Sequence, residues 1–325
     1  MKKNQKGIAH LVGLIGVIIV LAVGFTGYKV MQSNKDKEDG SKTTTTTTTT
    51  TKTETWKDGD YAVKGTYADA DVLKIEDSKW RMYYGVQPEV QGNQLEVYSA
   101  TSTNGKTWTQ ESGTRKTFAT FPAVVKLTDG KYRMYFQNAS VIKSAISSDG
   151  LSFSDEAGTR IDTSNSENLT FDNVAAPTVL LNADGTYTMV YRGTMDGRYV
   201  SDTPNSTTQL LMWATSTDGL TFTKKGIAVD SRNSTLRGHL DGPYIVKWDD
   251  GSTRVYVTNY NGVYMYKFDG SKFTAQTLAF ALDTDGKAVY GIPPGDPTLA
   301  KINNVWYMYY GFTGTTSGIH YAALQ

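Results

Sequence analysis

The stretch that decides the fold is Gly295-Asp296-Pro297-Thr298-Leu299, followed by Trp306-Tyr307-Met308-Tyr309-Tyr310. It describes a turn, a proline, an apolar strand, a short turn and a second strand rich in Tyr and Met. Three earlier segments repeat the pattern with its proline, and a first copy, Asp71-Val72-Leu73 before Arg81-Met82-Tyr83-Tyr84, lacks the proline. The centre of the second strand is residue 82, 134, 189, 255 or 308. Strand units with a period near fifty residues predict a β-propeller, here with five blades.

Each unit continues with a third strand, and in four of the five units a tight turn and an aromatic residue follow it. The turns are Asn104-Gly105, Asp149-Gly150, Asp218-Gly219 and Asp269-Gly270, and the aromatic residues are Trp108, Phe153, Phe222 and Phe273. Asn-Gly and Asp-Gly favour hairpin turns because both residues accept a positive φ. The aromatic residue is therefore expected to begin a fourth, outermost strand. The pattern predicts an all-β domain of four-stranded blades in which no helix is needed.

The fifth unit ends at Gln325 after its third strand, so its outer strand must come from elsewhere. The spare strand-like residues lie at the start of the domain, around Trp56 and Tyr61-Ala62-Val63. We expect this N-terminal strand to close the last blade, because closure removes the exposed edges of the ring. The longest interval, between residues 189 and 255, predicts an inserted rim loop from Gly193 to Thr208.

Composition narrows the function classes. The chain has 325 residues and a net charge of +1, so charge gives no reason to expect a nucleic-acid partner. Its 21 tyrosines suit half-buried, pleated surfaces. The absence of cysteine excludes disulfides, thiolate zinc sites and cysteine nucleophiles.

The N-terminal region predicts a membrane anchor. Residues 7–27 carry no charge apart from that of His10, and three lysines precede them. We therefore expect residues 1–31 to form a transmembrane signal anchor of a single-pass cell-membrane protein, with its C-terminal domain outside the cell. A cleaved signal peptide and a pilin-like N-terminus are the alternatives. Residues 32–55, with nine consecutive threonines, predict a flexible linker, either a glycosylated stalk or an inert spacer, and residues 56–325 form the propeller.

The opening residues of each first strand are expected to meet at one mouth of the central channel, where propellers usually bind ligands. These residues are Asp69 and Asp71, Phe121 and Ala123, Asn173 and Ala176, His239 and Asp241, and Asp296. Carboxylates from blades one, four and five would thus face a common axis. They could act on a ligand or, as aspartates often do before strands, cap turns by accepting hydrogen bonds from backbone N–H groups.

The blade pattern resembles a known superfamily. Gly-Asp-Pro-Thr-Leu before Trp-Tyr-Met-Tyr-Tyr, together with Ala-Thr-Ser-Thr-Asp-Gly-Leu-Thr-Phe at residues 214–222, is similar to the five-bladed arabinanase, xylosidase, levansucrase and invertase propellers, which include family-43 glycoside hydrolases. The resemblance covers the domain from about Trp56. It implies glycoside chemistry at the axis, with one carboxylate as base or nucleophile and a second as general acid. Such chemistry needs the two carboxyl groups about 5 Å apart for retention, or roughly 6.5–9.5 Å apart for inversion.

The resemblance assigns candidate catalytic residues one position at a time. Asp71 matches the blade-one base or nucleophile, although Val72 replaces the proline after it. Asp241-Gly242-Pro243 resembles the family's Glu-Gly-Pro acid motif, one blade later than usual and with Asp for Glu. Asp296 opens the fifth blade, with no role assigned by the family. Blade two has no acid in Phe121-Pro122-Ala123, where many of the hydrolases carry a third carboxylate.

Seven further side chains are expected to bind substrate around the mouth. They are Tyr67, Phe121, Asn173, Arg192, Arg237, His239 and Tyr244. Aromatic rings can stack on sugar faces, and arginine, histidine and asparagine can bind hydroxyl groups. No cofactor is expected and no metal-ligand cluster is visible in the sequence, although the resemblance would allow a central Ca²⁺.

The sequence therefore predicts a membrane-anchored, extracellular, monomeric propeller that binds carbohydrate and hydrolyses glycosidic bonds with axial aspartates. Two alternatives remain at this point. One is a glycan-binding propeller whose active site is degenerate, and the other is a surface adhesion or scaffold protein that acts through its rim loops. The side chains that face the axis distinguish these possibilities.

Overall fold

The computed structural model describes residues 54–86, 95–164, 168–203, 206–280, 294–312 and 318–325. Thr53–Gln325 form one compact unit. The predicted anchor and nearly all of the predicted linker lie outside the described residues. Within those residues no helix is long and apolar enough to cross a bilayer.

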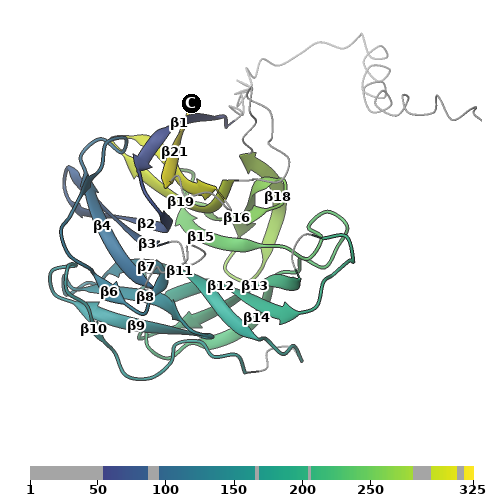
Figure 1. The fold of residues 1–325 in the computed structure, drawn as a ribbon. Coiled ribbons are helices and arrows are strands. Elements are labelled where there is room, and N and C mark those ends of the chain that lie inside the picture. Colours follow the sequence, from purple (N-terminus) through teal and green to yellow (C-terminus); the bar gives the residue numbers. More distant parts are fainter. Residues whose placement is uncertain (1–53, 87–94, 165–167, 204–205, 281–293, 313–317) are drawn as a thin grey trace, which may run out of the picture. The chain divides into compact units, whose positions relative to one another are not determined.

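Five separate antiparallel sheets form the described domain, as the repeat predicts. Blade one contains β2 (Tyr67–Glu76), β3 (Lys79–Val86), β4 (Glu96–Ser102), β5 (Thr109–Gln110) and β6 (Lys116–Thr117). Blade two contains β7 (Thr120–Lys126), β8 (Tyr132–Asn138), β9 (Val141–Ser147) and β10 (Ser154–Asp155). Blade three contains β11 (Asn173–Leu181), β12 (Tyr187–Asp196), β13 (Thr207–Ser216) and β14 (Thr223–Val229). Blade four contains β15 (Asp241–Lys247), β16 (Thr253–Asn259), β17 (Gly262–Phe268) and β18 (Phe273–Phe280). Blade five contains β19 (Pro294–Ile302), β20 (Val305–Phe312), β21 (Ile319–Leu324) and β1 (Trp56–Val63). Figure 1 shows the blades arranged around a centre that the first strand of each blade approaches.

The predicted closure of the ring is confirmed. β1 is hydrogen-bonded to β21, with Trp56 opposite Leu324. The Trp56 side chain is buried in the core between blades four and five. The hydroxyl of Tyr310 on β20 donates to the Asp58 carboxylate on β1. The outer strand of the last blade is thus held by ladder pairing, apolar burial and a side-chain hydrogen bond.

The core consists of five clusters, one between each pair of neighbouring blades. Four methionines at the centre of the second strands are fully buried, as expected for core residues: Met82, Met134, Met189 and Met308. Val255 holds the same place in blade four and is equally buried. Because each blade buries both faces against its neighbours, no single sheet has a core of its own.

Three of the four Asp-Gly and Asn-Gly turns that follow the third strands link neighbouring blades as well as reversing the chain. The Tyr83 hydroxyl of blade one donates to the Gly150 carbonyl of blade two over 2.9 Å. Tyr135 of blade two repeats this contact with Gly219 of blade three over 2.8 Å. Tyr309 of blade five reaches Gly105 of blade one over 2.7 Å. The aromatic residue after each of these turns packs edge-on against the same tyrosine, in the pairs Phe153–Tyr83, Phe222–Tyr135 and Trp108–Tyr309.

In blade three, both ends of the range predicted as a rim loop belong to strands. β12 continues to Asp196, which pairs with Thr207 at the start of β13. The first residues of the expected loop therefore extend a hairpin, because their backbone groups find ladder partners across the two strands. The long interval also includes the connection between β14 and β15, residues 230–240, which lies outside the range predicted for the insertion.

The turn contact can be tested with one hydroxyl group. Tyr135→Phe removes the donor to the buried Gly219 carbonyl, and we expect unfolding free energy to fall by about 1–2 kcal/mol. Tyr266→Phe is the matched control, because the structure gives the buried Tyr266 hydroxyl no partner among the described residues. Urea unfolding of both variants measures the difference. Equal losses would show that the tyrosine–turn contact does not stabilise the ring.

Candidate active site at the axial mouth

The axial site is built from one backbone feature that all five inner strands share. Each inner strand has a register shift near its start, and at that bulge one residue has φ between 46° and 55°. The residues are Asp69, Phe121, Ala176, Gly242 and Asp296. Proline follows this position in four blades and Ala70 follows it in the first. Four of the five are not glycine, and a left-handed conformation costs such a residue about 1–2 kcal/mol. Backbone strain of this kind is found most often at functional sites.

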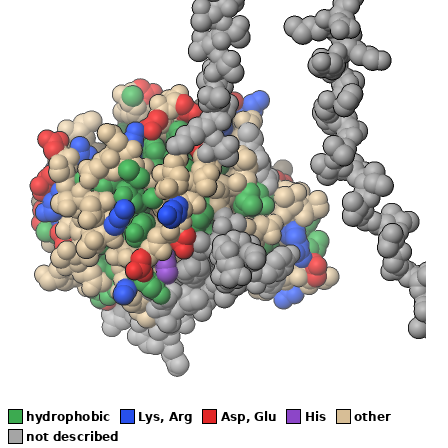
Figure 2. All heavy atoms as spheres, turned by 90° about the horizontal axis from the view of Figure 1, so that it is seen from above, with side chains coloured by type: hydrophobic (Ala, Val, Ile, Leu, Met, Phe, Trp, Pro, Cys, Tyr) green, Lys and Arg blue, Asp and Glu red, His purple; other side chains and the backbone are tan. Residues whose placement is uncertain are grey.

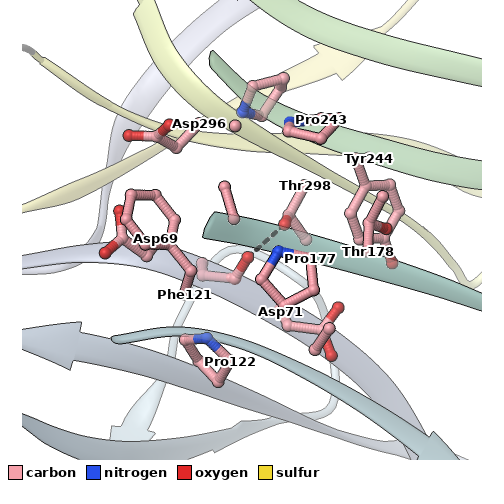
Figure 3. Close-up of a pocket in the computed structure, with 15 residues that line it drawn as sticks. Asp69, Asp71, Phe121, Pro122, Pro177, Thr178, Pro243, Tyr244, Asp296 and Thr298 are labelled. Atoms are coloured by element: carbon pink, nitrogen blue, oxygen red, sulfur yellow. Dashed lines mark hydrogen bonds between the residues drawn. The ribbon is translucent and has the colours of Figure 1, made fainter. Parts of the chain in front are cut away.

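The bulge changes which blade-one aspartate matches Asp296. Asp69 shares its φ and its place in the strand, whereas Asp71 lies two residues further on. The sequence did not reveal this register. The repeats can be aligned on their prolines, but Ala70 stands where the other blades have proline. Figure 3 shows Asp69 and Asp296 pointing to the same side of the pocket, and Asp71 pointing to the opposite side.

Asp296 is pressed against blade four. A Cβ atom at Gly242 would lie 2.0 Å from the Asp296 Oδ1 atom and 2.6 Å from its Cα atom. The Asp296 backbone N–H donates to the Thr258 hydroxyl over 2.8 Å. Glycine at the bulge of blade four is therefore required by the neighbouring aspartate as well as by its own positive φ. A Cβ atom at Gly85 on β3 would lie 3.5 Å from the Asp69 Oδ2 atom, so the Asp69 carboxylate lies beside the backbone of the second strand of its own blade.

The buried side chain of Arg192 lies among the carboxylates of the mouth. Both oxygens of Asp241 lie 2.5 Å from the Arg192 Nη1 atom. The negative charges of Asp241, Asp296 and Asp69 all act on this guanidinium group and counter the effect of burial, and the pKa of Arg192 is raised. The guanidinium also lies over the Phe121 ring, 5.6 Å from its centroid. The structure thus brings residues from all five blades together at the mouth. Phe121 is the side chain that blade two contributes.

Asp71 closes the deep part of the channel. Its Oδ2 atom accepts a hydrogen bond from the Val124 N–H of blade two over 2.6 Å, and the Tyr244 hydroxyl of blade four bonds to the same carboxylate. Thr178 makes the equivalent contact from blade three, where its hydroxyl accepts a hydrogen bond from the Ile245 N–H of blade four. Burial raises the pKa of Asp71 to about 7, against the lowering effect of these hydrogen bonds. The pocket bounded by the inner strands has a volume of about 30 Å³, so a sugar ring could bind only above it, at the mouth.

The other predicted binding residues lie at different depths. His239 Nδ1 lies 2.5 Å from Gln209 Oε1, its ring stacks on Tyr260, and burial lowers its pKa. Arg237 forms an ion pair with Asp202 over 2.9 Å, between partly exposed side chains. These two residues lie on the connections of blades three and four.

Tyr67 and Asn173 begin the inner strands of blades one and three. The Tyr67 ring packs edge-on against Tyr84 within the core between blades five and one, so its ring is committed to packing. The Asn173 Oδ1 atom is buried and has no hydrogen-bond partner among the described residues. An acceptor in that state is available to a ligand or water.

Sequence reasoning missed Phe118. Its side chain is 72% exposed and it has a φ of 54°, two residues before the inner strand of blade two. The strained backbone makes Phe118 a candidate ligand contact, because strained residues cluster at functional sites. The repeat could not reveal it, because Phe118 lies in a connection where the blades share no pattern.

A central Ca²⁺ ion would need several oxygen donors close together. No group of three or more His, Asp or Glu side chains in the described ranges is close enough to hold a metal ion. At the mouth, the guanidinium of Arg192 already supplies positive charge to the three aspartates. The donor set therefore does not fit the Ca²⁺ that the resemblance allows. On the face shown in Figure 2, acidic and basic side chains are interspersed among the described residues, and no large surface of one sign is present.

Comparisons with known proteins show the fold. No family model and no curated protein sequence matches the chain. A thermostable family-43 glycoside hydrolase has a TM-score of 0.59 at 14% identity, covering 83% of this chain and 92% of its own. CoXyl43, a GH43 β-xylosidase/α-arabinofuranosidase from a compost metagenome bound to xylotriose, has a TM-score of 0.57 at 15% identity, with 83% and 96% covered. A GH43_1 enzyme from Xanthomonas citri bound to xylose has a TM-score of 0.55 at 12% identity, with 82% and 90% covered. The chain thus shares the five-bladed fold of these hydrolases.

The close approach of blades four and five yields a stability prediction. Gly242→Ala should lower the unfolding free energy by about 2–4 kcal/mol, because the new Cβ atom meets Asp296 and φ is unfavourable. Ala176→Gly is the control, since Ala176 occupies the same bulge in blade three with a φ of 46°. Its effect should stay within about 1 kcal/mol. A harmless Gly242→Ala would contradict the described packing of Asp296.

The deep carboxylate yields a pH prediction. The pKa of Asp71 is about 7 in the folded chain against an ordinary 3.8, so between about pH 4 and 7 only the unfolded chain releases this proton. The wild-type protein should therefore lose stability as pH rises through this window, by at most about 1.4 kcal/mol per pH unit from this group. Asp71→Asn has no such proton. The difference in unfolding free energy between variant and wild type, followed from pH 4.5 to 7.5, should change steadily, and a constant difference would refute the prediction.

Proposed function

We propose that the propeller binds a glycan at its axial mouth and hydrolyses a glycosidic bond there. The observation that carries this proposal is the pair Asp69 and Asp296, which hold equivalent strained positions on the neighbouring blades one and five and point to the same side of the pocket. Similarity of fold to family-43 hydrolases, whose solved complexes contain xylose and xylotriose, supports the choice of substrate class.

We assign a different catalytic role to each of the two carboxylates because their surroundings differ. Asp69 is 7% exposed and lies deeper, at the blade-one position, so we assign it the role of base or nucleophile. Asp296 is half-buried at the pocket edge, where it can reach the leaving-group oxygen as the general acid. Asp241, fixed by Arg192, is better suited to orient a sugar hydroxyl than to transfer a proton. The earlier assignments of Asp71 as base and Asp241 as acid remain predictions, less well supported by these contacts than Asp69 and Asp296.

Phe121 and Phe118 complete the proposed sugar site. The Phe121 ring lies under the Arg192 guanidinium beside Asp69, and its exposed part can contact a sugar face near the carboxylates. Phe118 precedes the same strand and is largely exposed, so it can extend that contact along a glycan chain. The Asn173 acceptor and His239 are candidate partners for hydroxyl groups on the side of blades three and four.

The catalytic roles are tested by comparing leaving groups. Asp296→Asn should lower kcat/KM on xylo-oligosaccharides by about 10²–10⁴, and much less on dinitrophenyl xyloside, whose leaving group needs no proton. Asp69→Asn should lower kcat/KM on both substrates. Asp129→Asn changes an exposed aspartate in the turn between β7 and β8, at the end of the inner strand opposite the mouth, and serves as the control.

Two results would contradict these roles. Equal losses on both substrates for Asp296→Asn would remove its assignment as the acid. Wild-type activity in both variants would remove the axial pair altogether. A panel of pentose and hexose aryl glycosides, assayed with the wild-type protein before the mutants, identifies the sugar.

The second candidate function is glycan binding without cleavage. One observation favours it, the direct ion pair between Arg192 and Asp241. Asp241 is the carboxylate of the motif that resembles the family's Glu-Gly-Pro, and it is already paired with the arginine. Wild-type protein that binds xylo-oligosaccharides in calorimetry but cleaves no glycoside in the panel would select this function.

We further propose that the domain acts outside the cell, tethered by residues 1–31 and spaced from the membrane by residues 32–55. The basis is the apolar run and the threonine-rich segment in the sequence. Protease treatment of intact cells should release the propeller, and resistance of the domain until the cells are lysed would contradict this location.

A further inference from the structure

A second groove opens between blades three and four, at the end of the blades opposite the axial mouth. Its volume is about 700 Å³, and its walls include the ends of the inner strands, Leu180 and Lys247, and the turn Asp269-Gly270. A volume of this size suits a small ligand or one or two sugar residues.

The groove exists because blade three lacks a side-chain network that blades one and two share. In blade one the Arg81 guanidinium pairs with Glu111, which also accepts from the Ser99 hydroxyl. Arg133, Glu156 and Ser144 repeat this network in blade two. The strand registers place Thr188 at the arginine position, Val190 at the tyrosine position and Trp213 at the serine position of blade three. Lys225 stands where the glutamate is expected from the spacing.

The missing arginine and tyrosine leave the next turn open. Arg81 donates to the Asp149 carbonyl and Tyr83 to the Gly150 carbonyl at the junction of blades one and two. Arg133 and Tyr135 make the same two contacts with blade three. At the junction of blades three and four no described side chain donates to the carbonyls of Asp269 or Gly270, and these residues instead line the groove.

The lining fits a neutral, hydroxyl-rich ligand. Trp213 and Phe268 form an apolar wall, with ring centroids 5.2 Å apart. The hydroxyls of Thr215 and Thr253 also line the groove, and the structure gives them no hydrogen bond to any described residue. Lys247 opposes Asp184 and Asp269 in charge, so the lining favours neither a polyanion nor a polycation.

We propose that this groove is a second glycan-binding site, which takes one or two neutral sugar residues between blades three and four. Sugar hydroxyls would bond to the open carbonyls of the turn and to the free threonine hydroxyls, and the apolar wall would cover the ring carbons. The site is separate from the axial mouth, so it holds a glycan whether or not that mouth cleaves one.

The test fills the groove with the residue that the other blades use. Thr188→Arg should place a guanidinium beside the Asp269 carbonyl, as Arg81 and Arg133 do in their blades. We expect the full chain to bind xylohexaose at two sites in calorimetry, and Thr188→Arg to bind it at one. Hydrogen exchange should show xylohexaose protecting residues 182–188 and 247–253 in the wild type but not in the variant. Protection of residues 294–298, at the axial mouth, should remain in both.

A second, smaller substitution keeps the test valid if the Thr188→Arg variant does not fold. Thr215→Val removes one hydroxyl at nearly constant shape and should weaken binding at the groove about tenfold. Thr128→Arg adds the same charge at an exposed position in the β7–β8 turn of blade two, outside the groove lining, and should leave both sites intact. The proposal is overturned if the groove residues gain no protection from xylohexaose or arabinohexaose, or if Thr188→Arg and Thr215→Val both bind as the wild type does. Loss of axial protection alone would instead count against the proposed function.

Discussion

The structure depends on the burial of every blade face by the neighbouring blade. A four-stranded sheet of this composition has two apolar faces, and the five core clusters each lie between two sheets. An open row of blades would leave one apolar face uncovered at each end. The pairing of β1 with β21 therefore does more than complete a ladder, because it ties the two ends of the domain into the same blade. Glu54 adds to this tie through its ion pair with Arg254 of blade four, although the sequence placed Glu54 in the linker.

Ring geometry also explains why the axial residues are strained. Five inner strands converge on a narrow channel, and a bulge at the start of each strand turns one residue into the left-handed region. The side chain at that residue faces the mouth, while the side chain two residues later, such as Asp71 or Thr178, bonds to the backbone of the next blade. The first position thus places its side chain at the mouth, and the second holds the ring together. The strain is repeated in all five blades, so it belongs to the architecture of the ring, and the proposed function uses it only in the two blades that carry Asp69 and Asp296.

The sequence predicts what repeats and fails where the repeat is broken. Blade number, strand order and ring closure follow from a pattern that packing imposes on every blade, so they could be read without coordinates. The register at the mouth could not, because Ala70 removes the proline that marks it in the other blades. Arg192 was expected to bind substrate around the mouth, but its pairing with Asp241 joins strands β12 and β15, which only tertiary packing brings together. The tyrosine–turn contacts were likewise hidden, since Asp-Gly indicates a hairpin whether or not another blade donates to it.

Blade three shows how one unit can leave the pattern without opening the ring. It lacks the arginine–glutamate network and the tyrosine contact, and a buried ion pair of that kind is weak support for stability in any case. In their place its second and third strands are ten residues long and pair from Tyr187 to Asp196. The Trp213 ring packs against Phe268 and Phe273 of blade four, and the Thr178 hydroxyl and the Arg192–Asp241 pair join the same two blades near the axis. The junction is therefore held at its inner and apolar parts, which leaves its outer turn unoccupied. A gap maintained in that way is a property of the native fold, and its polar lining is consistent with a ligand.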